Sequence, residues 1–310
     1  MKQDASLPLV YHPIYSIPFP AQHRFPMAKF QLLYQQLCQQ GIATTQNCFS
    51  PSAPAPLSIL QLAHCPQYIQ QFCQGELDAK ALREIGLPWS PLLVQRTCTA
   101  VAGTILTAEL AKRYGLACHL AGGTHHAFYR HGAGFCIFND LAVCARYLVQ
   151  NGLAKQVLII DCDVHQGDGT AAILQQDANI HTCSFHSALN YPFTKMHSDW
   201  DIEIEDDCGD SDYLAILQQH LPSILACLQP DFILYDAGSD VHQDDRLGRL
   251  KLTDQGIRQR DNYIIQLAHQ HNIAIACVIG GGYDRDHAEV ARRHSLLHQQ
   301  ANLLFNQLYR

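Results

Sequence analysis

The sequence predicts an α/β fold in which helices flank a parallel sheet. The chain has 310 residues, of which 47% are hydrophobic and 16% charged, enough apolar material for the core of one large domain. From about residue 95 onward, stretches with helical periodicity alternate with short apolar runs. Several runs are continuously apolar, as parallel strands buried on both faces are. We therefore expect a single domain over residues 1–310, built from alternating strands and helices.

The expected elements follow one another along the chain. Helices are expected at residues 95–114, 140–150, 214–228 and 255–271. Strands are expected at residues 116–121, 157–160, 180–185, 232–235 and 273–279. The first helix should end at Gly115, because glycine commonly terminates helices.

Each predicted strand is followed directly by polar or glycine-rich residues. In chain order these are GGTHHA, DCDVHQGDG, His186, DAGSDVHQDD and GGGYDRD. In open parallel sheets, ligands bind beyond the carboxyl ends of the strands. Five segments would therefore meet at one edge of one sheet, and we expect the functional site there.

Charge and composition disfavour several classes of protein. Lysine and arginine number 21 against 28 acids, a net charge of −7 without any basic block, so no nucleic-acid partner is expected. No apolar run reaches the roughly 18 to 20 residues that span a bilayer, so no membrane partner is expected. The start, MKQDASLPLVYHP, lacks the features of a secretory signal, so we expect a cytoplasmic protein. The 13 scattered cysteines are expected to be reduced.

The segment after the second predicted strand indicates a metal site. Asp161, Asp163 and His165 alternate, so in an extended chain their side chains point the same way. Carboxylate and imidazole donors suit zinc or iron(II). A catalytic zinc needs three protein ligands and an open position, and Asp240 is the best-placed third ligand beside Asp163 and His165. The alternative is that the acids cap the following helix or lie in a solvated turn.

The pair His125–His126 in a glycine-rich turn suggests general acid–base catalysis. One ring can act as base and the other as acid or electrostatic partner. Each needs an acceptor on its far nitrogen, and Asp161 and Asp168 could serve. The alternative is a pair of surface histidines, which their place at a strand end disfavours.

Two aromatic residues near glycines are weaker candidates. The Tyr283 hydroxyl, after three glycines, could donate a hydrogen bond to a developing oxyanion. The alternative is a phosphate-binding loop or a packed tyrosine. Phe135 in HGAGFCIF could line a narrow tunnel, or it could belong to the core.

Together these segments resemble the histone deacetylase superfamily, the zinc-dependent acyl-lysine amidohydrolases of the arginase/deacetylase fold. The resemblance runs from about Tyr11 to Tyr283 and occurs in the family's order, through GGTHHA, GAGFCIFND, VLIIDCDVHQGDGT, CSFH, DAGSDVHQDDRLG and GGGY. The form DAGSDVHQDDRLGRL, with VQRTCTAVAGT upstream, is most similar to class IV and its bacterial relatives. The resemblance implies three layers around an eight-stranded, mostly parallel sheet.

The resemblance also implies a role for each matching residue. The zinc ligands are Asp163, His165 and Asp240. In the tandem pair His126 is the general base, Asp161 orients His125, and Asp168 orients His126. Tyr283 stabilises the transition state, and the substrate contacts are Gly134 and Phe135, with Tyr191 or Phe193 as the second tunnel wall. A monovalent cation, potassium, would be held by Asp161, Asp163, His165, Ser184 and Phe185, several through backbone carbonyls.

The implied activity is removal of acetyl or longer acyl groups from lysine side chains, with zinc, or alternatively iron(II), as the metal. An acylated protein or peptide is the expected substrate, and an acylated polyamine or other small amine is the alternative. The shape and charge of the pocket rim, to which residues 75–91 could contribute, would decide between them. An arginase-type two-manganese site lacks its closely spaced second acid here, and an inert acyl-lysine binding module would not need a complete catalytic set.

Overall fold

Eight strands form one sheet in a computed structural model that describes residues 6–309. The strands are β1 (Leu9–Val10), β2 (Cys48–Phe49), β3 (Leu116–His119), β4 (Val157–Asp161), β5 (Ile180–Ser187), β6 (Trp200–Ile204), β7 (Phe232–Asp236) and β8 (Ala274–Val278). Their order is β2-β1-β3-β8-β7-β4-β5-β6, and every pairing is parallel. Residues 1–5 and Arg310 lie outside the described residues. Residues 1–5 begin the segment MKQDASLPLVYHP, in which no secretory signal is expected.

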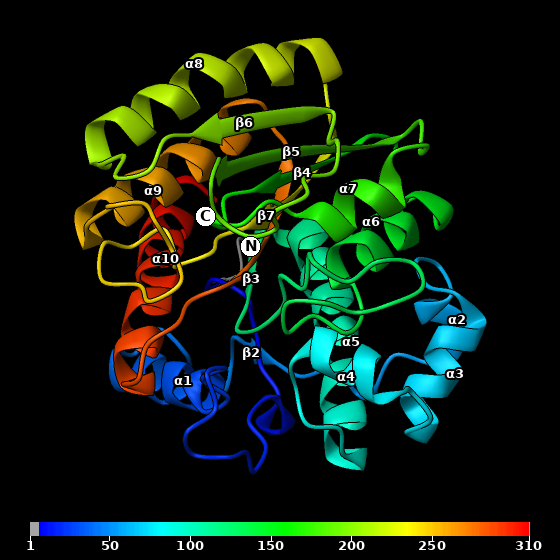
Figure 1. Cartoon of the computed structure of the whole chain (residues 1–310). Coiled ribbons are helices and arrows are strands. Elements are labelled where there is room, and N and C mark those ends of the chain that lie inside the picture. The colour runs from blue at the N-terminus through cyan, green and yellow to red at the C-terminus, as the bar shows by residue number, and fades with distance from the viewer. Residues whose placement is uncertain (1–5, 310) are drawn as a thin grey trace.

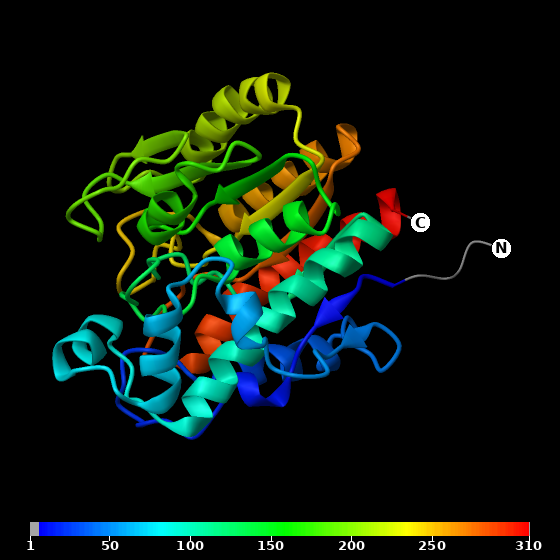
Figure 2. The same cartoon turned by 90° about the vertical axis from the view of Figure 1, so that its right-hand side faces the viewer.

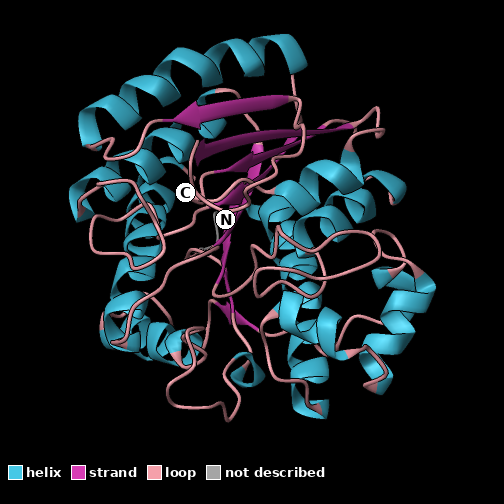
Figure 3. Ribbon diagram, viewed as in Figure 1, coloured by secondary structure: helices cyan, strands magenta, loops and turns pink. Residues whose placement is uncertain are grey.

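Helices pack on both sides of this sheet (Figures 1 and 3). They are η1 (Pro13–Tyr15, 3₁₀), α1 (Lys29–Gln39), α2 (Leu57–Leu60), α3 (Pro66–Gln74), α4 (Ala79–Ile85), α5 (Pro91–Tyr114), α6 (Asp140–Gln150), α7 (Asp168–Leu174), α8 (Asp210–Leu228), α9 (Asp254–Gln270) and α10 (His287–Leu308). One layer contains α5, α6 and α7, the opposite layer contains α1, α9 and α10, and α8 lies beyond the edge strand β6 (Figures 1 and 2). The expected α/β fold with an eight-stranded parallel sheet is confirmed.

The predicted elements all occur, with shifted ends. The helix expected from residue 95 begins at Pro91, because the Ser90 side chain accepts a hydrogen bond from Leu93 N–H and Pro91 occupies the first turn. Strand β3 ends at His119, two residues before its expected end. The residue-by-residue pattern did not predict β1 and β2, which have two residues each, or the partly exposed β6.

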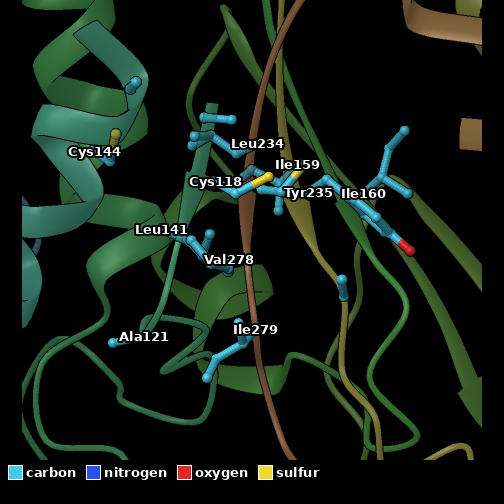
Figure 4. Packing of buried hydrophobic residues seen from close by; sticks show 14 of the residues in the cluster. Cys118, Ala121, Leu141, Cys144, Ile159, Ile160, Leu234, Tyr235, Val278 and Ile279 are labelled. Atoms are coloured by element: carbon cyan, nitrogen blue, oxygen red, sulfur yellow. The ribbon is translucent and has the colours of Figure 1, made fainter. Parts of the chain in front are cut away.

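The core lies where the helix layers meet the sheet. Ile159, Leu234 and Val278 on three strands are at most 1% exposed, and Figure 4 shows them beside Leu141 and Cys144 of α6. Burial on both faces explains why the central strands read as unbroken apolar runs. The 13 cysteines are free, as expected. Among the helices of residues 6–309, none combines the length and hydrophobicity needed to cross a membrane.

A buried histidine makes the stability of this fold depend on pH. The Nε2 atom of His64 accepts a hydrogen bond from Asn139 N–H at 2.8 Å, just before α6, and Nδ1 lies 3.0 Å from the Phe128 carbonyl oxygen. Because a backbone N–H can only donate, the ring must be neutral, with its proton on Nδ1. Burial accordingly lowers the pKa of His64 to about 4.

We therefore expect acid to destabilise the wild type more than a His64→Gln variant, whose amide can donate and accept but does not titrate. The unfolded chain takes up a proton near pH 6.5, the folded chain only near pH 4, so stability falls as pH drops between these values. Urea unfolding at about pH 7 and about pH 5 should show an extra loss of about 2 kcal/mol in the wild type. Equal losses in both proteins would contradict this assignment.

Candidate metal centre and active site

The site lies at the carboxyl ends of four adjacent strands, β3, β8, β7 and β4. Each strand is followed by one of the polar segments singled out in the sequence: GGTHHA, GGGYDRD, DAGSDVHQDD and DCDVHQGDG. Because all four strands are parallel, their carboxyl ends meet at the same edge of the sheet. This arrangement brings residues more than 150 positions apart in the sequence into one site.

Three side chains converge as expected of metal ligands. The Nδ1 atom of His165 lies 2.9 Å from Oδ1 of Asp163 and 3.1 Å from Oδ2 of Asp240. Asp163 and Asp240 are at most 1% exposed, and their other oxygens accept hydrogen bonds from Gly281 N–H and Val164 N–H. The backbone thus holds Oδ2 of Asp163 and Oδ1 of Asp240. The other oxygen of each carboxylate lies near Nδ1 of His165, and these three atoms could bind a ligand together.

The donor set of this group fits a divalent metal. Atoms bound tetrahedrally to one zinc ion at about 2.0–2.1 Å lie roughly 3.3 Å apart, close to the distances between these donors. Two buried carboxylates also repel each other: burial and the neighbouring Asp163 raise the pKa of Asp240 to about 6. A cation would remove that repulsion, so Asp163, His165 and Asp240 could hold it.

Close backbone approach explains one glycine of the GGGY segment. A Cβ atom at position 281 would lie 2.1 Å from Oδ2 of Asp240 and 2.6 Å from Oδ2 of Asp163. Only glycine allows the N–H of residue 281 to reach the Asp163 carboxylate without a clash. Gly281 is therefore part of the frame around the acids.

The expectation that Asp161 points with Asp163 and His165 toward one centre is wrong. Strand β4 ends at Asp161, and the chain then turns, so the alternation of side chains does not continue. The Oδ2 atom of Asp161 lies 2.7 Å from Nδ1 of His125, and its Oδ1 accepts a hydrogen bond from Asp163 N–H. Asp161 is buried, so the alternative of a solvated turn is wrong as well.

The two adjacent histidines lie side by side, each against a different carboxylate. Nδ1 of His125 faces Asp161, and Nδ1 of His126 lies 2.6 Å from Oδ1 of Asp168. The ring centroids are 4.1 Å apart, and both side chains are buried, which is not the arrangement of surface histidines. The paired carboxylates leave both Nε2 atoms available on the other side of each ring.

The surroundings distinguish the two rings. Burial lowers the pKa of His125, but Asp161 and Asp163 outweigh it and hold that pKa well above the ordinary value. Burial and the neighbouring charge of His125 lower the pKa of His126 to about 4 despite Asp168. The pair therefore combines a ring that favours its protonated form with one that favours its neutral form.

Tyr283 lines the mouth of the site, the depression that His126, His165, Phe135 and Tyr191 also border. Its ring centroid is 6.4 Å from that of His165 and 5.8 Å from that of Phe135. The backbone N–H of Tyr283 donates to Oδ2 of Asp245 at 2.7 Å, which anchors the residue. Burial, followed by Asp163 and Asp240, raises the pKa of the phenol well above 10, so its hydroxyl keeps its proton and can donate.

Gly134 and Phe135 form one wall of the mouth. Their N–H groups donate to the carbonyl oxygens of Glu84 and Ile85 at the end of α4. Both residues have positive φ values, +53° and +67°, a strained conformation for phenylalanine that turns the chain at the site. A Cβ atom at position 134 would lie 2.7 Å from Cδ2 of His126, so a side chain there would press on that ring.

Tyr191 lines the mouth as well. Its ring centroid lies 4.9 Å from that of His126 and 6.3 Å from that of His165. Phe193, the alternative candidate, also borders the mouth but is 89% exposed, so its ring points largely to solvent. Of the two residues, Tyr191 is thus the one that contacts the histidines.

The strand pairing places some of the residues expected to hold a monovalent cation near one another. The β4–β5 register pairs Asp161 with Ser184, and Phe185 is fully buried next to it. The ring of His165 faces Asp163 and Asp240, so its backbone carbonyl is the part that could contact such a cation. His186, expected after the strand, lies within β5 and contacts Ser184 Oγ at 3.0 Å. The cation site stays a prediction.

Several buried charged residues near the site were missed. Asp236 ends β7 and is fully buried, and neither carboxylate oxygen has a hydrogen-bond partner among residues 6–309. It forms a second acid–histidine group with His125 and Asp161, which shares no residue with the first group. Asp236 is the first acid of DAGSD, the sequence signal that could have identified it.

Two cations and one further acid also border the site. Lys29 Nζ donates to the Gly280 carbonyl oxygen at 3.1 Å, and Lys29 and Arg96 line an inner cavity beside Tyr283. Asp140 accepts hydrogen bonds from Gly123 N–H and Thr124 N–H and so fixes the turn before the histidines. No local sequence pattern marks Lys29, which lies on α1 far from the motifs, whereas Arg96 lies within the segment VQRTCTAVAGT, which gave no indication of a place near the site.

Comparisons with known proteins agree with this arrangement. The sequence profile described as "Histone deacetylase domain" matches residues 23–298. An uncharacterised protein of Picosynechococcus sp. is 49% identical over 95% of this chain and 98% of its own length. Histone deacetylase 2 of Arabidopsis thaliana is 28% identical over 91% of this chain and 76% of its own, and acetoin utilization protein AcuC of Staphylococcus aureus is 26% identical over 85% and 73%.

Solved structures show the same fold. The crystal structure of an HDAC homolog complexed with SAHA has a TM-score of 0.83 and 22% identity, and covers 96% of this chain and 84% of that chain. The HD domain of HDA15 has a TM-score of 0.75 and 20% identity, and covers 97% and 95%.

The sheet and the group of acids and histidines at its carboxyl edge define a parallel α/β enzyme with a site suited to a metal ion. The chain belongs to the histone deacetylase family. It is therefore a hydrolase that acts on acyl amides, in a family that is generally metal-dependent.

Proposed function

We propose that this chain removes acyl groups, acetyl or longer, from lysine side chains of proteins or peptides, with one divalent metal ion. Zinc is the metal proposed, and iron(II) is the alternative for the same donors. The observation that carries the proposal is the convergence of Asp163, His165 and Asp240 at the inner end of a mouth lined by aromatic side chains.

The roles of the residues follow from their contacts. When bound, the ion would polarise the amide carbonyl and lower the pKa of water. His126, oriented by Asp168, would take a proton from the attacking water. The Tyr283 hydroxyl would donate a hydrogen bond to the developing oxyanion. A protonated histidine of the pair would then give a proton to the leaving lysine amine.

The mouth suits an extended substrate side chain. Phe135 and Tyr191 both line it, and Gly134 leaves room beside His126. The methylene groups of an acyl-lysine would pass between the two aromatic rings, and the amide would reach the histidines. A resemblance to class IV, a cytoplasmic location and a bound potassium ion remain part of the proposal.

The test is a panel of acyl-lysine peptides, from acetyl to long-chain fatty acyl, assayed beside acetylated polyamines, with metal analysis of the same preparation. Hydrolysis of one or more peptides with about one metal ion per chain would support the proposal. Hydrolysis of polyamines alone would transfer the activity to small amines. Bound metal without hydrolysis of any substrate would contradict it.

Removal of the Tyr283 hydroxyl should slow turnover without loss of metal. The Tyr283→Phe variant keeps the ring against Phe135 and the backbone bond to Asp245, so the fold of the mouth should survive. Loss of one oxyanion donor typically costs about 10²-fold or more in kcat. Steady-state kinetics and metal analysis would test this, and unchanged turnover would count against the role of Tyr283.

A further inference from the structure

Arginines surround the mouth of the site although the chain as a whole is acidic. Arg83 on α4, Arg24 before α1 and Arg249 after β7 line the mouth, and Arg246 lines an adjoining depression with Arg24 and Tyr283. All four are exposed, on a chain with a net charge of −7. Positive charge is therefore concentrated where a substrate would enter.

Few acids neutralise this cluster, which we call the mouth arginines (Arg24, Arg83, Arg246 and Arg249). Within residues 6–309, only Arg249 has an acidic partner within 4.0 Å, Asp206 at 3.0 Å. The two other charged residues that line these depressions, Glu84 and Asp284, already face Lys80 and Arg293. Three guanidinium groups thus remain available to an incoming anion.

The mouth also carries exposed apolar side chains. Leu189 is 64% exposed and Phe193 89% exposed, and both line the same mouth. Neighbouring exposed apolar residues beside a pocket are typical of a surface that contacts a macromolecule. A small acylated amine, held at the histidines, would leave both these apolar residues and the arginines without a function.

We propose that this mouth selects acyl-lysine residues that lie in acidic segments of proteins and disfavours acylated polyamines. The inference rests on the proposed acyl-lysine activity and adds to it the chemical class of the flanking sequence. Carboxylates on either side of the acyl-lysine would meet the mouth arginines, whereas the free ammonium groups of a polyamine would be repelled by them.

The expected preference is moderate and depends on salt. Exposed ion pairs contribute little each, so three of them should yield about a 10-fold difference between acidic and basic peptides in kcat/KM at low ionic strength. The Debye length falls to about 3 Å at 1 M salt, so most of the preference should disappear there. The effect should lie in KM, because the arginines do not reach the reacting atoms.

Three peptides of equal length, with acetyl-lysine between glutamates, between glycine and serine, or between lysines, would be assayed together with acetylspermidine. The expected order of kcat/KM is acidic, neutral, basic, with acetylspermidine lowest. Equal values for the three peptides, or acetylspermidine as the best substrate, would overturn the inference.

A charge-reversed variant tests whether the mouth arginines cause the preference. Arg24→Glu, Arg83→Glu and Arg246→Glu combined should abolish or invert the order, with little change in kcat for the neutral peptide. The matched control combines Lys112→Glu, Arg113→Glu and Lys155→Glu, three exposed cations just before β3 and β4, at the opposite edge of the sheet. It changes the net charge equally and should keep the wild-type order; an equal shift in the control would overturn the inference.

Binding provides a second readout that does not need turnover. Fluorescence anisotropy of the three labelled peptides on a His126→Ala background should give the same order of Kd. If that order appears but no peptide is hydrolysed by the unmodified enzyme, the proposed activity fails and the charge selection stands. If peptides are hydrolysed without any order in KM or Kd, the charge selection alone fails.

A triple exchange of the mouth arginines Arg24, Arg83 and Arg246 to glutamine covers the case in which the charge-reversed variant does not fold. It is expected to remove the preference for acidic peptides without inverting it.

Discussion

Replacement of Asp240 by alanine should leave a folded chain that no longer retains its metal. Asp240 is one of the three donors proposed for the metal, and its Oδ2 lies 3.1 Å from Nδ1 of His165. Two protein ligands are too few for a stable zinc site. Since metal assistance contributes several kcal/mol to such reactions, hydrolysis should fall by at least about 10³-fold.

The fold should tolerate this change. Alanine leaves the Val164 N–H without its acceptor, a cost of about 1–3 kcal/mol. It also removes the repulsion between the buried carboxylates of Asp163 and Asp240, which raises the pKa of Asp240. The two effects act in opposite directions, so we expect a similar Tm for the metal-free wild type and the variant.

Metal analysis after dialysis, activity and Tm would be measured for Asp240→Ala and for Asp244→Ala. Asp244 is an exposed neighbour that does not belong to the acid–histidine group, so its variant should keep both metal and activity. Stoichiometric metal in Asp240→Ala would show that the ion is held elsewhere.

Replacement of His126 by alanine should also abolish activity but, unlike Asp240→Ala, should leave the metal bound. His126 is outside the ligand group, and its ring centroid is 5.7 Å from that of His165. Loss of a positioned general base or acid typically costs about 10²–10⁴-fold. Asp168, deprived of its partner, still accepts a hydrogen bond from Gly169 N–H, so the start of α7 should persist.

His131→Ala is the matched control for this variant. His131 lies in the same glycine-rich region but is exposed and stacks on Phe128. Its loss should change neither metal content nor turnover. Wild-type activity in His126→Ala would disprove a role of this ring in proton transfer, and loss of metal would place His126 among the ligands instead.

Local patterns predicted much of the central sheet because each strand carries its own signal. A strand such as Val157–Asp161, buried on both faces, must be apolar at nearly every position, so it can be recognised without its neighbours. The two-residue strands β1 and β2 are too short for any periodicity, and they are strands only because β1 pairs with the edge of β3 and β2 pairs in turn with β1.

The residues of the site also differ in how far the sequence alone could predict them. Asp163, His165 and Asp240 could be proposed from strand ends alone, since parallel strands deliver their carboxyl ends to one edge. The direction in which Asp161 points could not, because it depends on where β4 stops and the chain turns. Lys29 contacts Gly280, 251 positions later, and no pattern within either segment indicates that contact.

The sequence alone determined the order of helices and strands and the polar residues that follow each strand. Both can be read from patterns of a few residues, because backbone periodicity and burial act over that range. Only tertiary packing decided which carboxylate faces each imidazole and how the end of α4 binds the backbone of Gly134 and Phe135. It also decided that arginines from three separate segments gather at the mouth. These contacts join residues from distant parts of the chain, and their distances depend on how whole layers pack.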